Sequence, residues 1–287
     1  MTTKNPLILL LSGLLAYTLI IGPFTSTMNN KTIVEKLGYV PSTTLLKPLS
    51  ADQKEIVAAS LVMKVLMYFG GAVEPIQNKK TISEPLDLQG MSRLLHGAVK
   101  LDPYNMDAYY FAQAFLTWDA KQFSIANELL EYGMGFRTWD WYLPFFAGFN
   151  HAYFLKDFQK ASIFYKRAAE LSGQDLHKRL AGRYLQESGQ TELAIVYMTT
   201  VIESQKNPTL KKMYETRLLA FQEIFKIEQA RDVFQAERDR LPTTVKQLYE
   251  FGYLKSLPKD PYGGEFFIDQ SGKVLTTSKF AFATKNK

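Results

Sequence analysis

The side chains that most often carry chemistry are sparse and scattered along this sequence. His96, His151 and His177 are isolated from one another, and each falls in a segment expected to be helical. An isolated helical histidine is more often packed or solvated than a ligand. The carboxylates of Glu237 and Asp239 lie close together, but they belong to a charged helical segment and are expected to be solvated.

The absence of cysteine excludes thiol catalysis, disulfides and cysteine-ligated metals. The sequence also lacks the phosphate-binding, dinucleotide-binding, zinc-protease and serine-hydrolase motifs. It therefore predicts no enzyme, no cofactor, no metal site and no small-molecule substrate. The net charge of +6 comes without a dense Lys/Arg cluster, so nucleic acid is not an expected partner. A solvated basic surface, or one that lies near anionic lipid, fits this charge better.

An uncharged segment near the N-terminus, residues 6–24, predicts a membrane anchor. As a helix it would extend roughly 28 Å, about one hydrocarbon core. A cleaved signal peptide would have a shorter apolar core and a small-x-small cleavage site, and no such site follows. Residues 1–28 are therefore expected to form an uncleaved signal anchor, and residues 29–49 a linker. Lysines flank both sides of the segment, so the positive-inside rule does not decide its orientation.

A repeat organises residues 106–208. Three similar segments align on Ala126, Ala161 and Ala194, with offsets of 161 − 126 = 35 and 194 − 161 = 33 residues. A period in the mid-thirties built from paired amphipathic helices is typical of helical repeats, which stack to share one core. The small side chains are expected where neighbouring helices cross closely.

The repeats resemble the tetratricopeptide family. Residues 98–103, AVKLDP, are similar to the end of that family's second helix, and Gly182, Gly189 and Ala194 match its small and turn positions. The resemblance implies an α-solenoid of about three and a half helical hairpins over residues 50–210. Residues 211–240 are then expected to form one or two capping helices.

Three residues depart from the family pattern. Lys121 and Lys156 replace the turn glycine, and Gly148 lies one residue out of register. The first helix of the domain is expected to begin at a capping box that starts at Ser50, and to end at the glycine pair at residues 70 and 71.

In the tetratricopeptide family, the first helices of successive hairpins line a concave groove. Alignment on the three alanines places eight side chains in this partner groove: Phe111, Phe115, Trp118, Asn150, Tyr153, Arg179, Arg183 and Gln186. Aromatic residues give way to basic and amide residues along it. That suits an extended peptide with an apolar anchor and an acidic group or C-terminal carboxylate. Alternatively, the aromatic residues pack against the helix at residues 50–69 and the arginines are merely exposed.

The C-terminal segment, residues 234–268, resembles the end of the major pseudopilin of type II secretion systems. The similar residues are LPTT at 241–244 and GYLKSLPKDPYGG at 252–264. Two strands, EFFI and KVLTTS, are expected about a turn at residues 269–272. The N-terminal pilin methylation motif is missing. Some relatives bind calcium, and Asp260, Glu265 and Asp269 could supply oxygens. The EF-hand pattern is absent, however, which favours turn-forming and surface acids.

The sequence thus predicts a mostly α protein: a tetratricopeptide-like α-solenoid with one N-terminal transmembrane helix and a small C-terminal α/β cap at residues 241–287. The expected function is a membrane-anchored protein–protein interaction scaffold, for a secretion or pilus-like assembly. Its expected location is the bacterial inner membrane, single-pass, with most of the chain extracytoplasmic as the pseudopilin resemblance implies. The alternatives are a filament subunit built in through its C-terminus and an accessory subunit of an enzyme.

Overall fold

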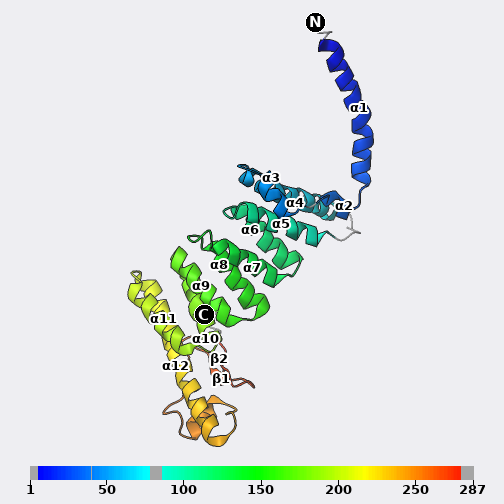
Figure 1. Cartoon of the computed structure of the whole chain (residues 1–287). Helices are drawn as coiled ribbons and strands as arrows, with labels where there is room; N and C mark the ends of the chain where they lie inside the picture. The colour runs from blue at the N-terminus through cyan, green and yellow to red at the C-terminus, as the bar shows by residue number, and fades with distance from the viewer. Residues whose placement is uncertain (1–5, 40, 78–85, 279–287) are drawn as a thin grey trace. The chain divides into compact units, whose positions relative to one another are not determined.

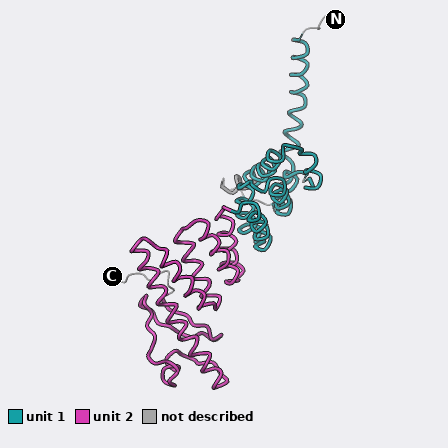
Figure 2. The backbone as a smooth tube through the Cα atoms, turned by 60° about the vertical axis from the view of Figure 1, so that its left-hand side comes forward, with its two compact units in different colours: residues 1–138 teal, residues 139–287 magenta. Residues whose placement is uncertain are grey.

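The computed structural model describes residues 6–39, 41–77 and 86–278. Helices make up 73% of it, so the protein is mostly α, as the sequence predicts. The chain divides into two compact units, Met1–Thr138 (unit 1) and Trp139–Lys287 (unit 2), which Figure 2 distinguishes by colour. Each unit has its own helices and core and is described separately.

Unit 1 begins with α1 (Pro6–Asn30), a helix long and apolar enough to cross a membrane. It passes Pro23 without a break (Figure 1). Its apolar residues are not buried against any other part of the described protein. A bare apolar helix of this length is stable in lipid, because its backbone groups are all paired within the helix.

The rest of unit 1 is a series of helices. They are α2 (Ile33–Leu37), α3 (Thr43–Leu49), α4 (Lys54–Gln77), α5 (Leu88–Leu101), α6 (Met106–Ala114) with the π-helical turn η1 (Phe115–Asp119), and α7 (Phe123–Met134). From α4 to α7, each helix packs against the next, while α2 contacts α4 and α3 contacts α5. Leu94, Leu95 and Ala98 of α5 are completely buried, because α5 lies among these neighbours.

Three expectations for the start of the domain are wrong. The expected linker contains α2 and α3, and the helix expected to begin at Ser50 begins at Lys54. Ser50 instead ends α3, and its hydroxyl donates to the carbonyl of Leu46 at 2.6 Å. The glycine pair at 70 and 71 does not end α4, because interior glycines weaken a helix by about 1 kcal/mol each without breaking it. A loop is expected over residues 72–86, and residues 78–85 of it lie outside the described residues.

Unit 2 continues the helical series and ends in a small cap. Its elements are α8 (Tyr142–Asn150) with the π-helical turn η2 (His151–Leu155), α9 (Phe158–Ser172), α10 (Asp175–Glu187), α11 (Thr191–Ser204), α12 (Pro208–Arg238), α13 (Val245–Glu250), β1 (Phe266–Ile268) and β2 (Val274–Thr276). The region expected to hold one or two capping helices is the single helix α12. The two predicted strands are confirmed and pair antiparallel, with Phe267 opposite Leu275.

The three repeat alanines occupy equivalent places. Ala126, Ala161 and Ala194 are each the fourth residue of their helix, and none has accessible surface. Close helix packing at these positions agrees with the sequence alignment. The arrangement of the hairpins as a tetratricopeptide-like solenoid stays a prediction.

The π-helical turn η2 accommodates one additional residue. Gly148 precedes Ala161 by 13 residues, whereas Gly182 precedes Ala194 by 12. Even so, the two glycines make equivalent contacts. A Cβ on Gly148 would lie 3.2 Å from the ring of Tyr165, and a Cβ on Gly182 would lie 2.6 Å from Cε of Met198. Tyr165 and Met198 each follow their repeat alanine by four residues, so the packed position is the same in both hairpins.

Hydrogen bonds at the helix ends locate the additional residue. At the end of α10, the amide of Gln190 donates to the carbonyl of Leu185, five residues back. At the end of η2, the amide of Asp157 donates to the carbonyl of His151, six residues back. The additional residue therefore lies between His151 and Asp157, and it explains why Gly148 is out of register. A π turn is the usual way for a helix to absorb one insertion.

The turn glycine of the repeat is needed for its backbone conformation. Gly189 has φ +82°, and the two lysines that replace it, Lys121 and Lys156, have φ +53° and +55°. A residue with a Cβ is strained in this left-handed region.

We expect Lys121→Gly to raise the free energy of unfolding of unit 1 by about 1 kcal/mol, because it removes this strain. Urea denaturation of the full chain in detergent, followed by far-UV circular dichroism, measures the change. The matched control is Glu131→Gly, at an exposed interior position of α7, which should lower stability by about 1 kcal/mol. A loss of stability in both variants would contradict the strain argument.

Candidate functional site

The eight predicted groove residues are divided between the two units. In unit 1, Phe111 lies on α6, and Phe115 and Trp118 lie on η1. Phe111 is half-buried, Phe115 is buried and Trp118 is 57% exposed. Trp118 is therefore the member of this group with most of its surface open to a partner.

The other five residues lie in unit 2. Asn150 and Gln186 are buried, Tyr153 is 58% exposed, and Arg179 and Arg183 are half-buried. Phe115, Asn150 and Gln186 are thus core side chains as the protein stands, and they cannot line an open groove. The structure leaves Tyr153 and the two arginines as accessible candidates in this unit.

The inserted residue in η2 explains why Asn150 was misplaced. Alignment on the alanines pairs Asn150 with Arg183, because both precede their alanine by 11 residues. The packed glycines instead pair Phe149 with Arg183, since each directly follows its glycine. Sequence reasoning missed Phe149, and the signal that could have found it was the register shift of Gly148.

Phe149 and Tyr153 form a stacked aromatic pair. Their ring centroids are 5.5 Å apart, with an interplanar angle of 7°. The ammonium group of Lys156 lies 5.2 Å from the centroid of the Tyr153 ring, which places a cation beside the pair. This arrangement offers a flat apolar surface with a positive edge.

Helix α10 lies next to α8 and supplies the basic side chains. The rings of Phe145 and His177 are 4.8 Å apart, which joins the two helices directly. Nε of Arg183 lies 2.6 Å from a carboxylate oxygen of Glu187, and its guanidinium stands 5.5 Å from the ring centroid of Tyr184. Arg183 is therefore held in place by an ion pair and an aromatic ring, with part of its surface still open. We call Phe149, Tyr153, Arg179 and Arg183 the α8–α10 face.

The histidines do not assemble into a catalytic group among the described residues. His151 and His177 are buried, and burial lowers the pKa of each imidazole. His177 Nδ1 lies 2.7 Å from the Ser172 hydroxyl, and His151 Nδ1 lies 3.8 Å from Asp157. Both are packed side chains, and burial favours the neutral form of each imidazole. The third, His96, is half-buried on α5.

Two of the three possible calcium ligands of the cap, Asp260 and Asp269, accept hydrogen bonds within turns. The backbone carbonyl of Asp260 accepts from the amide of Gly263 at 2.9 Å, and its carboxylate accepts from the amide of Tyr262 at 2.8 Å. Asp at the first position, Pro261 at the second and glycine at the fourth match the preferences of a type I turn. The hydroxyl of Thr276 also donates to the Asp260 carboxylate, which ties the turn to β2.

The carboxylate of Asp269 serves the turn between β1 and β2. It accepts from the hydroxyl and amide of Ser271 and from the amide of Lys273. These donors lower the pKa of Asp269, the Ser271 hydroxyl most of all. Within the described part of the chain, no group of three or more His, Cys, Asp or Glu side chains is arranged to hold a metal ion.

The comparisons with known proteins give no family for this chain. No model of a known protein family matches it, and a search of curated proteins finds no significant similarity.

Proposed function

We propose that the chain is a membrane-anchored scaffold that binds another protein through a groove formed by tetratricopeptide-like hairpins. The observation that carries the proposal is the α8–α10 face. Successive first helices there present a stacked aromatic pair and then two partly open arginines. A peptide segment with an apolar anchor and an acidic group or free carboxylate is the partner that this chemistry fits.

The proposed location is the bacterial inner membrane, with α1 as the single anchor and the rest of the chain outside the cytoplasm. The length and composition of α1 support the anchor. The pseudopilin-like cap supports the sidedness and a role in a secretion or pilus-like assembly, by analogy of sequence alone. Protease treatment of spheroplasts tests the sidedness, because only an extracytoplasmic body would be digested.

Crosslinking in native membranes tests the scaffold proposal. We expect Arg179→Glu with Arg183→Glu to reduce crosslinked partner at least about tenfold, because the reversed charge repels an acidic segment. Tyr153→Ala should also weaken capture, by loss of the apolar anchor. The matched control is Lys211→Glu with Lys212→Glu, an exposed pair on α12 of the same charge change. If the amount of crosslinked partner is unchanged in the arginine variant, or falls equally in the control, the basic groove is wrong.

Incorporation into a filament through the cap is the second candidate. Tyr249, Phe251 and Phe267 of the cap are each more than 40% exposed, and exposed aromatic side chains are common at protein interfaces. The missing methylation motif argues against it. Detection of the chain in purified fibres would favour the filament role over the scaffold role.

A further inference from the structure

A pocket of about 560 Å³ lies in unit 1, between the segment after α2, helix α5 and helix α7. Helix α5 contributes Arg93, His96 and Lys100, which are spaced three and four residues apart and therefore share one face. The proposed partner groove does not use this pocket.

The two cations of the pocket are not neutralised by close ion pairs. Arg93 and Lys100 are exposed, and within the described residues neither has a carboxylate within 4.0 Å. Glu128 of α7 is the acidic residue of the lining, so the pocket carries a net positive charge. Two free cations on one wall make a site for an anion.

The remaining polar groups of the pocket suit the oxygens of a phosphate. Nδ1 of His96 lies 2.8 Å from the carbonyl of Ser92. Because a carbonyl can only accept, Nδ1 is the donor of this hydrogen bond. Thr43 and Ser42 also line the pocket and add hydroxyl donors. Arg, Lys and hydroxyl groups together form a typical phosphate donor set.

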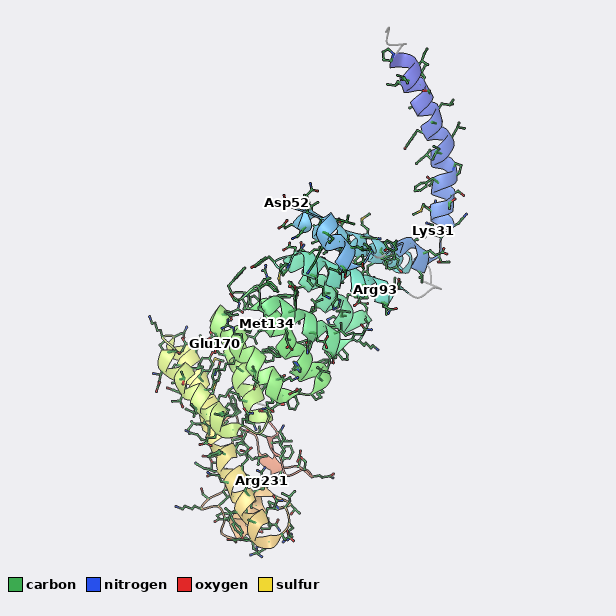
Figure 3. All side chains as sticks on the ribbon, viewed as in Figure 1. Lys31, Asp52, Arg93, Met134, Glu170 and Arg231 are labelled. Carbon is green, nitrogen blue, oxygen red and sulfur yellow. The ribbon has the colours of Figure 1, made fainter. Side chains whose placement is uncertain are left out.

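Part of the pocket's lining belongs to the segment of unit 1 that follows the anchor helix. Helix α2 begins three residues after α1 ends. Its Leu37 is buried against the start of α5, so closely that a Cβ on Gly90 would lie 2.5 Å from Cδ2 of Leu37. Gly90 precedes Arg93 by three residues. Figure 3 shows Lys31 at the lower end of the anchor helix and Arg93 among the helices below it.

Exposed apolar side chains accompany the pocket. Tyr39, which lines it, is 75% exposed, and Leu45 and Leu49 of α3 are 56% and 79% exposed. These residues belong to the same short segment that follows the anchor. Apolar side chains next to unpaired cations are the combination that binds a lipid interface.

We propose that this pocket binds the headgroup phosphate of an anionic phospholipid, while Tyr39, Leu45 and Leu49 enter the interface. The proposal rests on the membrane anchor of the proposed function, and it is independent of the partner groove. Binding would hold unit 1 against the bilayer in which α1 is anchored, rather than leave it on a free tether.

Titration calorimetry of the full chain in a neutral detergent tests the proposal. Dihexanoyl phosphatidylglycerol is the probe, and dihexanoyl phosphatidylcholine and inorganic phosphate are the comparison ligands. We expect saturable binding of one phosphatidylglycerol, with at least tenfold weaker binding of the other two. Arg93→Gln with Lys100→Gln should weaken phosphatidylglycerol at least about tenfold, since two charge-assisted hydrogen bonds are lost. Glu128→Gln should strengthen it, because a repelling charge is removed.

The matched control is Lys211→Gln with Lys212→Gln, which removes the same charge from α12 of unit 2. If both double variants weaken phosphatidylglycerol binding equally, the pocket proposal is wrong and the effect is a nonspecific one of charge. Inorganic phosphate that binds as tightly as phosphatidylglycerol would overturn the lipid as the source of the phosphate. Partner crosslinking of the Arg93/Lys100 variant should stay at the wild-type level, which separates failure of this pocket from failure of the scaffold function. Recovery of the wild-type chain in the soluble fraction would remove the anchor on which the pocket proposal rests.

Discussion

Replacing Phe234 by alanine is expected to lower the free energy of unfolding of unit 2 by about 3–5 kcal/mol. Phe234 lies near the end of α12 and has no accessible surface. Its ring centroid is 5.3 Å from that of Tyr253 and 5.9 Å from that of Phe251. The same core holds Leu248 of α13 and residues of both strands, so Phe234 belongs to the core that the cap shares with α12.

The truncation should therefore open the cap before it opens α9 and α10. Urea denaturation measures the total loss, and hydrogen exchange resolved by peptide shows where it occurs. The control is Val233→Ala, because Val233 is 49% exposed on the same helix and should cost less than about 1 kcal/mol. A loss below 1 kcal/mol for Phe234→Ala, or uniform loss of exchange protection across unit 2, would refute the ring's role as the centre of the cap.

Replacing Asp260 by alanine is the second large change, with an expected loss of about 2–3 kcal/mol. Its buried carboxylate accepts from the hydroxyl of Thr276, from the hydroxyl of Ser278 at 2.5 Å and from the amide of Tyr262 at 2.8 Å. Alanine removes the acceptor that these three donors share, and Thr276 is itself buried. The loss is expected to detach the turn from β2 while α13 stays folded.

Asp260→Asn separates the charge of this group from its shape. The amide keeps one acceptor oxygen, and we expect it to lose roughly half as much stability as alanine. Glu250→Ala is the surface control, because its ion pair with Lys246 is exposed and should contribute less than about 0.5 kcal/mol. Hydrogen exchange of the β1 and β2 amides is the measurement. Full protection of these strands in Asp260→Ala would show that the carboxylate does not hold the hairpin.

The cap was the most predictable part of the fold, because its signals are local. Asp260, Pro261 and Gly263 specify a turn by their own side chains and backbone preferences. Gly264 is required by space, since a Cβ there would lie 2.7 Å from the amide nitrogen of Ser278. Such requirements are visible in a short stretch of sequence. The two predicted strands flank turns of this kind.

The start of the helical region was less predictable, because competing local partners decide it. The residues from Ser50 to Gln53 fit a capping box. The Ser50 hydroxyl instead donates to the carbonyl of Leu46 in the preceding helix. That choice depends on α3, which the polar composition of the segment did not indicate. Helix α3 exposes Leu45 and Leu49 and has no buried residue. Its apolar residues therefore do not form the buried stripe by which a packed helix is predicted from sequence.

The partner groove stays a prediction, and the structure shows only which of its residues are accessible. The alanine alignment found Tyr153, Arg179 and Arg183, which have accessible surface in unit 2. It also selected Asn150, which is buried, because the alignment assumed a constant number of residues per hairpin. A π turn has no distinctive composition. Its sign in the sequence is that Gly148 lies one residue out of the repeat register.

The π turn η2 has a consequence for how this chain can vary. Because the packed contacts of Gly148 and Ala161 match those of Gly182 and Ala194, a change of length between them leaves the interior undisturbed. The stretch from Gly148 to Lys156 holds one residue more than the stretch from Gly182 to Gly189. Insertions at this point can therefore add a side chain to the outer surface while the core stays the same.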